Sequence, residues 1–192
     1  MAGLPHYQNS LFGINNYEPV YLNQFEVLIS PPASVTLANT RFKGEGILTQ
    51  QVKKISGLAV DIQPTGAASQ YYKFAERRYA GGAPSDTSVA FSIDFEVNLN
   101  EQNSMIVYKI MRQWADLIYN PLTGAMGLKK DYVGSIVVSI FNKQGDVFRR
   151  ISLNNCFLTA DLTAMELSYD AGENLYILST SWKADYWQDQ FI

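Results

Sequence analysis

The sequence has 192 residues, of which 47% are hydrophobic and 13% aromatic, which fits one domain with a packed core and excludes a disordered polymer. Only 17% of the residues are charged, the formal net charge is -3 and no basic run occurs, so a protein that grips nucleic acid through its phosphates is disfavoured. The low charged fraction, with many Tyr, Ser, Thr and Asn, modestly favours a protein that buries its surface in partners over an ordinary β-rich domain.

Residues that carry enzyme chemistry are scarce in this sequence. His6 is its only histidine and Cys156 its only cysteine, which excludes an intrachain disulfide and removes Ser-His and Cys-His catalysis and most zinc chemistry. The carboxylates are scattered, and residues 81–84 lack the lysine of a phosphate-binding loop. We therefore expect no enzyme, no cofactor and no metal, and we expect Cys156 to be buried rather than reactive.

The N-terminal region shows no targeting signal. Residues 1–20 contain Pro5, Gly13 and Pro19 but no apolar core flanked by Lys or Arg, which predicts an arm with little regular structure and no signal peptide. No apolar run approaches the ~20 residues of a membrane helix. We expect a soluble protein made in a cytoplasm, with one domain over residues 21–192.

Strands are expected on both sides of an insertion in the first third of this domain. Alternating apolar residues predict a strand over Asn23–Ser30, which ends at two prolines. Residues 31–47 are mostly small and polar, and they are interpreted as a loop or insertion. Residues 49–55 and 58–63 then form either a broken strand pair or one strand bent around Ser56-Gly57.

The next segment is polar yet rich in aromatic residues. Pro64–Ser69 is expected to be a loop, Gln70–Tyr79 an edge strand, and Gly81-Gly82 a turn. Glu76-Arg77-Arg78 is the densest charge run of the chain. A solvated strand edge and an ion pair between subunits explain this run equally well.

A strand and a helix form the clearest pair of elements. Thr87–Asn98 alternates apolar and polar residues, which predicts a strand with one buried face. Glu101–Asn120 repeats apolar residues every three or four positions, which predicts the main helix, with Asn98 or Asn100 as its N-cap. We expect these residues to form a helix–sheet core: Phe91, Ile93, Phe95, Val107, Ile110, Met111, Trp114, Leu117 and Ile118.

The C-terminal third is expected to be rich in strands. Residues 133–142 and 147–154 predict a hairpin, and residues 165–170 predict a further strand. Leu175–Trp187 alternates bulky and polar residues, and such a strand closes a sheet or docks on a neighbour. The bulky residues of this strand are Tyr176, Leu178, Trp182, Tyr186 and Trp187. Many strands around one helix predict a mainly β fold, an antiparallel sandwich or small barrel flanked by that helix.

Several short motifs, in their order and spacing, carry a resemblance to a known family. They are Asn23–Val27, Arg78–Gly82 before the strand Val89–Ile93, the helix with Trp114, Lys130–Tyr132, Ile136–Phe141, Leu153–Phe157, Leu167–Asp170 and Ala184–Trp187. Over about residues 21–187 the sequence resembles the tail tube proteins of contractile, T4-like bacteriophages, which are related to the tube proteins of type VI secretion systems and pyocins. Phe157 stands where that family commonly has a proline.

The resemblance implies a structural protein of the virion tail, assembled in the host cytoplasm. It implies hexameric rings in which sheet edges join across subunits, and the stacking of these rings into a hollow tube inside a contractile sheath. Its partners would be further copies of itself and the sheath, baseplate and terminator proteins. The tape measure protein and the genomic DNA would pass through the lumen without specific binding, and the net acidity is compatible with this passage.

Contacts between subunits are expected at the arm, the insertion at residues 31–47, the loop at residues 64–69 and the strand at residues 70–79. The individual residues predicted for the subunit or ring interface are Gly66, Tyr71, Tyr72, Phe74, Arg77, Arg78 and Tyr79. Two alternatives are the tube or tube-initiator subunit of another contractile injection system and, further away, a β-barrel that binds a small apolar ligand.

Overall fold

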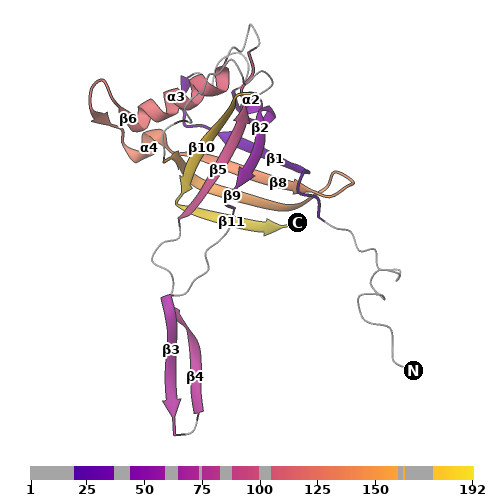
Figure 1. The fold of residues 1–192 in the computed structure, drawn as a ribbon, viewed down its shortest axis with the longest axis vertical. Helices are drawn as coiled ribbons and strands as arrows, with labels where there is room; N and C mark the ends of the chain where they lie inside the picture. Colours follow the sequence, from indigo (N-terminus) through magenta and orange to yellow (C-terminus); the bar gives the residue numbers. More distant parts are fainter. Residues whose placement is uncertain are drawn as a thin grey trace.

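Pairing between antiparallel strands dominates the computed structural model, which describes residues 20–36, 44–58, 65–73, 75–82, 88–99, 105–159, 162 and 175–192. Seven strands form the main sheet in the order β1-β8-β9-β10-β5-β2, with β11 also paired to β9 (Figure 1). Their bounds are β1 Phe25–Ser30, β2 Val52–Ser56, β5 Val89–Glu96, β8 Gly134–Phe141, β9 Val147–Leu158, β10 Ile177–Ala184 and β11 Tyr186–Phe191. The mainly β, antiparallel fold class predicted from the sequence is therefore confirmed.

The main sheet is bent because two long stretches of chain turn at the same place. β9 has 12 residues; it pairs with β11 up to Asn154, and its last two residues pair with β10. Asn155, between these two pairings, has a left-handed φ of 54°, which Asn tolerates better than most residues. Asp185 separates β10 from β11, and its N–H donates to the Asn154 carbonyl at 3.1 Å. Figure 1 shows β10 and β5 crossing β8 and β9.

Alternate residues of the sheet strands are buried in one core. In β5, Val89, Phe91, Ile93 and Phe95 are each at most 5% exposed, as the two-residue period of a strand requires. The same alternation buries residues of the other strands: Val27, Ile29, Ile136, Val138, Ile151, Leu153, Leu178 and Trp182. β10 therefore closes the core between β5 and β9.

Helix α3 (Ile106–Ile118) covers this core with one apolar face. Its buried residues are Val107, Ile110, Met111 and Trp114, and Leu117 and Ile118 are partly buried. Trp114 meets Trp182 of β10 edge to face, with ring centroids 4.8 Å apart. The Nε1–H of Trp114 donates to the carbonyl of Tyr132 at 2.7 Å, which ties the short helix α4 (Lys129–Tyr132) to α3.

Two small hairpins lie outside the main sheet. Among the described strands, β3 (Thr65–Tyr72) and β4 (Ala75–Gly82) pair only with each other, and they stand apart from the main sheet (Figure 1). β6 (Tyr119–Asn120) and β7 (Ala125–Met126) form a shorter pair directly after α3. The turn between β6 and β7 is held by Asn120, whose Oδ1 accepts the Leu122 N–H at 2.9 Å.

Three local predictions from the sequence are wrong. Residues 44–50 form helix α2 (Gly44–Gln50), where a loop and the start of a strand were expected, because Ile47 and Leu48 are buried and α2 packs against β1. Residues 65–69 belong to β3 rather than to a loop, and Gly81-Gly82 belongs to β4 rather than to a turn. Cross-strand hydrogen bonding there outweighs the low strand propensity of small residues.

The ends of two further elements also differ from the prediction. α3 begins at Ile106 with Met105 as its N-cap and no side-chain cap hydrogen bond, whereas Asn98 only accepts the Met105 N–H through its backbone oxygen at 3.0 Å. The C-terminal strand is interrupted at Asp185, so Tyr186 is 51% exposed instead of sharing the buried face. Residues 1–19, 37–43, 59–64, 100–104 and 163–174 lie outside the described residues, with the predicted arm, the cap Asn100 and the strand at 165–170.

Candidate functional site

The β3–β4 hairpin is the most isolated element of the described chain. Tyr71, near its tip, is 76% exposed. Glu76 lies opposite Tyr71 in the strand register and is also exposed. A two-stranded hairpin is at best marginally stable in water on its own, so this hairpin gains stability wherever a second surface covers it.

Most residues predicted for the subunit interface lie on this hairpin. Gly66, Tyr71 and Tyr72 belong to β3, Arg77, Arg78 and Tyr79 belong to β4, and Phe74 lies outside the described residues. The register places Arg77 opposite Gln70 and Arg78 opposite Ser69. The sequence pattern predicted that some of these residues lie in a loop and the others in a strand. In the structure, those that are described all lie on one projecting hairpin.

The main sheet ends in strands that are paired on one side only. Among the described strands these are β1, β2 and β11. Such edges carry a row of unpaired N–H and C=O groups and readily pair with another chain. Leu28 of β1 is 44% exposed and Phe191 of β11 is 74% exposed. The sequence pattern singled out neither residue, and its only signal was the outward position of Leu28 between two buried residues of the strand.

An ion pair fastens the β11 edge to β9. Arg149 donates from Nη2 to Asp189 Oδ2 at 2.7 Å and from Nε to Asp189 Oδ1 at 3.0 Å, a two-pronged geometry that makes such pairs strong. The hydrogen bonds to Asp189 raise the pKa of the Arg149 guanidinium. The guanidinium also lies 5.4 Å from the ring centroid of Phe191. β11 is therefore held on β9 while its outer edge stays open.

A charged cluster holds the bend between β10 and β11. Lys129 Nζ lies 2.7 Å from both carboxylate oxygens of Asp185, and Asn155 Nδ2 donates to Asp185 Oδ2 at 3.0 Å. The hydrogen bond from Lys129 is the main cause that lowers the pKa of Asp185 below its ordinary value. Because α4 supplies Lys129 and β9 supplies Asn155, the cluster sets the direction in which the β11 edge leaves the core.

Metal-ligand groups and the single cysteine were located among the described residues. No group of three His, Cys, Asp or Glu side chains among them is placed to hold a metal ion. Cys156 is buried, its Sγ–H donates to the Leu153 carbonyl at 3.3 Å, and burial raises the pKa of this thiol to about 12, so it stays protonated at neutral pH. Within the same residues, none of the helices has the length and apolar character needed to cross a membrane.

Comparison with known proteins finds similar solved structures but no match by sequence. No protein-family model and no curated protein matches the sequence. Among solved structures, the fold is similar to a chain of the PVC sheath–tube complex of an extracellular contractile injection system in its extended state, with a TM-score of 0.57 and 13% identity over 99% of this chain and 100% of that chain. The fold is also similar to the tube-terminating cap of the anti-feeding prophage, with a TM-score of 0.57 and 15% identity over 95% of this chain and 98% of that chain.

A third similar structure is the PVC sheath/tube terminator in its extended state, with a TM-score of 0.54 and 14% identity over 92% of this chain and 99% of that chain. The chain has the fold of a contractile injection system tube protein. The expected relationship to contractile tail tubes is thereby confirmed at the level of the fold. In this fold, the open sheet edges and the β3–β4 hairpin are among the surfaces that the described part of the chain leaves uncovered.

The bulky residues of the predicted C-terminal strand are divided by the bend at Asp185. Leu178 and Trp182 are fully buried in β10, and Tyr176 is partly buried just before it. Beyond the bend, Trp187 packs partly against the core, whereas Tyr186 faces outward. The strand therefore closes the sheet with its first part and presents an open edge with its second part.

Proposed function

We propose that this chain is the tube subunit of a contractile tail, and that six copies join edge to edge into a ring. The observation that carries this proposal is that a chain with the tube protein fold leaves β1, β2 and β11 open on one side among its described strands. Pairing these edges between neighbouring copies uses their unpaired backbone groups. Different edges meet in such a contact, so it is head-to-tail and closes into a ring when the rotation between copies allows.

The stacking of rings is the role that we assign to the β3–β4 hairpin and the N-terminal arm. The hairpin projects from the main sheet (Figure 1), and Tyr71 is 76% exposed, so cover from a second subunit would stabilise both. In this proposal, Glu76-Arg77-Arg78 makes ion pairs between subunits. The full set of residues proposed for these contacts is Gly66, Tyr71, Tyr72, Phe74, Arg77, Arg78 and Tyr79.

The proposed partners follow from the same architecture. The similar structures are described as a sheath–tube complex, a tube-terminating cap and a sheath/tube terminator, which supports a sheath around the tube and a terminator at its end. A baseplate at the start of the tube is a further part of the proposal. The formal net charge of -3 favours a lumen that lets DNA pass without holding it. The role is structural, and the protein works as part of a virion tail.

A second candidate is the tube or tube-initiator subunit of an injection apparatus that carries no genome. The observation in its favour is that the similar structures come from extracellular contractile injection systems and an anti-feeding prophage. Particles purified from cells that express the natural gene separate the two. Nuclease-resistant DNA in those particles supports the phage tail, and particles without DNA support the second candidate.

Negative-stain electron microscopy of the purified protein at several concentrations tests assembly. We expect hollow tubes or six-fold rings of uniform width. Leu28→Lys places a charge on the β1 edge and should abolish rings without unfolding the protein, whereas Leu122→Lys, at a site 94% exposed on the β6–β7 turn, should keep them. A protein that stays monomeric at every concentration, and also when tail baseplates are added, would overturn the proposal.

Removal of residues 1–18 tests the role of the arm in stacking. We expect the shortened protein to form rings but to stack poorly. Tubes as long as those of the full chain would show that the arm plays no part in stacking, while leaving the edge-to-edge ring untouched.

A further inference from the structure

A small pocket opens beside the turn between β8 and β9, close to the start of β1. We call it the Gln24 pocket, and its walls include Val20, Tyr21, Gln24, Phe141 and Phe148. Its volume is about 170 Å³, and two of its apolar walls are open to solvent, since Val20 is 59% and Tyr21 40% exposed. An apolar cavity of about 150 Å³ holds a benzene ring, so the Gln24 pocket has room for one aromatic side chain.

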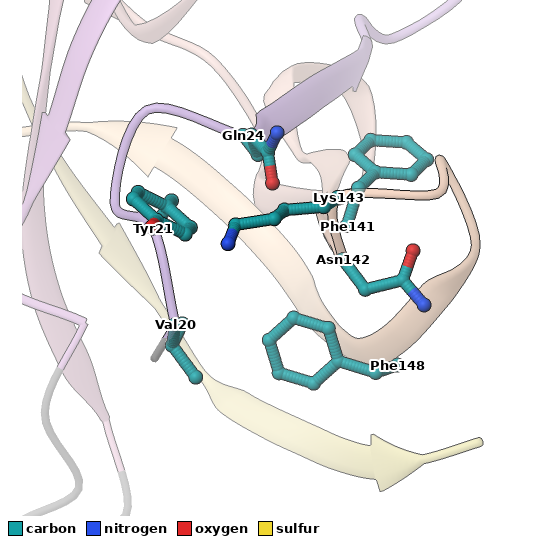
Figure 2. Close-up of a pocket in the computed structure, with 7 residues that line it drawn as sticks. All are labelled: Val20, Tyr21, Gln24, Phe141, Asn142, Lys143 and Phe148. Carbon is teal, nitrogen blue, oxygen red and sulfur yellow. The ribbon is translucent and has the colours of Figure 1, made fainter. Parts of the chain in front are cut away.

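A positively charged side chain also lines this pocket. Lys143 comes from the β8–β9 turn and is exposed, and Figure 2 shows its side chain extending toward Tyr21. Its Nζ lies 4.8 Å from the ring centroid of Tyr21. A fitting occupant therefore carries an aromatic ring for the pocket and, beside that ring, a carboxylate for the Lys143 ammonium group.

The β3–β4 hairpin presents such a pair of side chains. Tyr71 is 76% exposed, and Glu76, directly opposite it in the strand register, is also exposed. Directly opposite residues of an antiparallel pair share one face, with their Cβ atoms about 4.5–5.5 Å apart. The hairpin thus offers a ring and a carboxylate side by side, which is the combination that the Gln24 pocket and Lys143 fit.

The other exposed aromatic side chains of the described strands lack a carboxylate directly opposite them. Phe191 is 74% exposed, and Tyr119 and Tyr186 are each 51% exposed. Their partners in the strand register are Arg149, Met126 and Asn154. Tyr71 is therefore the exposed ring that best matches the pocket and its charge.

A second pair of opposite charges favours the same contact. Lys73 lies in the turn of the hairpin, two positions after Tyr71, and is exposed. Asp146 lies in the β8–β9 turn, three positions after Lys143, and is exposed as well. Docking of Tyr71 brings the two turns together, so each turn meets charges of both signs that are complementary to its own.

We propose that the Gln24 pocket receives Tyr71 of a second copy of this chain, with Glu76 of that copy beside Lys143. This contact rests on the proposed assembly into a tube, and it names the surface that the hairpin meets on a copy in the next ring. β3 has eight residues and spans about 26 Å, which lets the hairpin cross to another subunit. Docking covers both the Tyr71 ring and the apolar walls of the pocket, which are exposed in the single chain.

An exchange of the two charges tests this contact. Glu76→Lys and Lys143→Glu should each raise the protein concentration needed to form tubes about threefold to tenfold, because repulsion replaces attraction. The two changes combined should bring that concentration back to within about twofold of the natural chain. Sedimentation and electron microscopy measure it, and single rings should persist in all three variants because the sheet edges are unchanged.

Lys130 supplies a matched control for this exchange. It is an exposed lysine on α4, so Lys130→Glu changes the net charge as much as Lys143→Glu does but should not compensate for Glu76→Lys. Tubes in which the exchange gives no rescue, or in which Lys130→Glu rescues equally well, would overturn this contact alone. A protein that stays monomeric at every concentration, with or without baseplates, would overturn the contact together with the proposed function.

Cross-linking then tests whether the contact joins different copies. Tyr71→Cys protein assembled together with Lys143→Cys protein should form disulfide-linked heterodimers under mild oxidation, while the buried Cys156 stays reduced. Tyr71→Cys with Leu122→Cys, on the exposed β6–β7 turn, is the control and should cross-link at least about tenfold more slowly, because docking does not hold these two sites together. Equal rates, or a disulfide within one unassembled chain that carries both Tyr71→Cys and Lys143→Cys, would contradict docking of Tyr71 on a second copy.

Discussion

The β10 strand and the β3–β4 hairpin are both antiparallel backbone structures, but they differ in what covers them. Trp182 of β10 is 1% exposed, packed between Phe91 and Trp114. Tyr71 of β3 is 76% exposed, on a hairpin that is paired only with itself among the described strands. The comparison teaches that the described chain covers its main sheet from within, whereas it leaves Tyr71 of the hairpin open to solvent.

The largest loss of stability is expected from a substitution in the covered strand β10. Trp182→Ala removes a ring from contact with Trp114 and Phe91 and should lower the free energy of unfolding by about 3–5 kcal/mol, because a cavity remains in a packed core. Denaturant unfolding followed by circular dichroism measures this change. Leu122→Ala, at a site 94% exposed, is the control and should change the free energy by less than about 0.5 kcal/mol. Similar losses for both variants would contradict the assignment of the core.

A smaller loss of stability is expected from a substitution at the bend between β10 and β11. Asp185→Asn removes the ion pair with Lys129 and should cost about 1 kcal/mol at neutral pH, since the side chains are 32% and 52% exposed and water screens them. Asp116→Asn, which breaks the surface pair with Arg112 on α3, is the control and should cost about 0.3–0.5 kcal/mol.

The pH dependence sharpens this prediction. The pKa of Asp185 is lowered in the folded protein, so its contribution to stability is fully present above the unfolded pKa of about 3.9. The contribution is lost as the pH falls through the folded pKa. The stability difference between the natural chain and Asp185→Asn should therefore be constant from about pH 5 to 8 and shrink below about pH 4. A difference that grows on acidification would contradict the role of Lys129 as its partner.

The smallest expected effect on stability falls on the hairpin. Tyr71→Ser should change the free energy of unfolding by less than about 0.5 kcal/mol, because the ring touches little of its own chain. The same variant should raise the protein concentration needed to form tubes, measured by sedimentation and electron microscopy. Tyr119→Ser, at an exposed tyrosine on β6, should leave tube formation unchanged. A large loss of stability in Tyr71→Ser would mean that the hairpin packs on its own chain.

Sequence periodicity predicted the elements that bury one regular face. β5 and the buried face of α3 lie where their two-residue and three-to-four-residue patterns placed them. The pattern missed α2, because Gly44-Glu45-Gly46 has low helix propensity and the helix depends on burying Ile47 and Leu48. It also missed β3, because Gly66-Ala67-Ala68 has low strand propensity and the strand depends on pairing with β4.

The sequence indicated only some of the exposed elements that the structure shows. The aromatic and charged residues at positions 71–79 drew attention from their composition, and the structure places those that it describes on one hairpin. The sequence pattern could not show that β1, β2 and β11 are edge strands. Whether a strand lies at an edge depends on the order of the strands in the sheet, which only the fold determines. The Gln24 pocket was equally hidden, since its walls come from the start of β1 and from the β8–β9 turn.

The sequence by itself determined the periodic strands, the amphipathic helix and the scarcity of catalytic residues, because each of these depends on neighbouring positions or on simple counts. Only the tertiary structure decided where the last strand bends. At that bend Asp185 meets Lys129 and Asn155, which lie 56 and 30 positions away in the chain. No local pattern contains such a meeting, because folding alone brings these side chains together at the point where the strand that closes the core gives way to the edge that stays open.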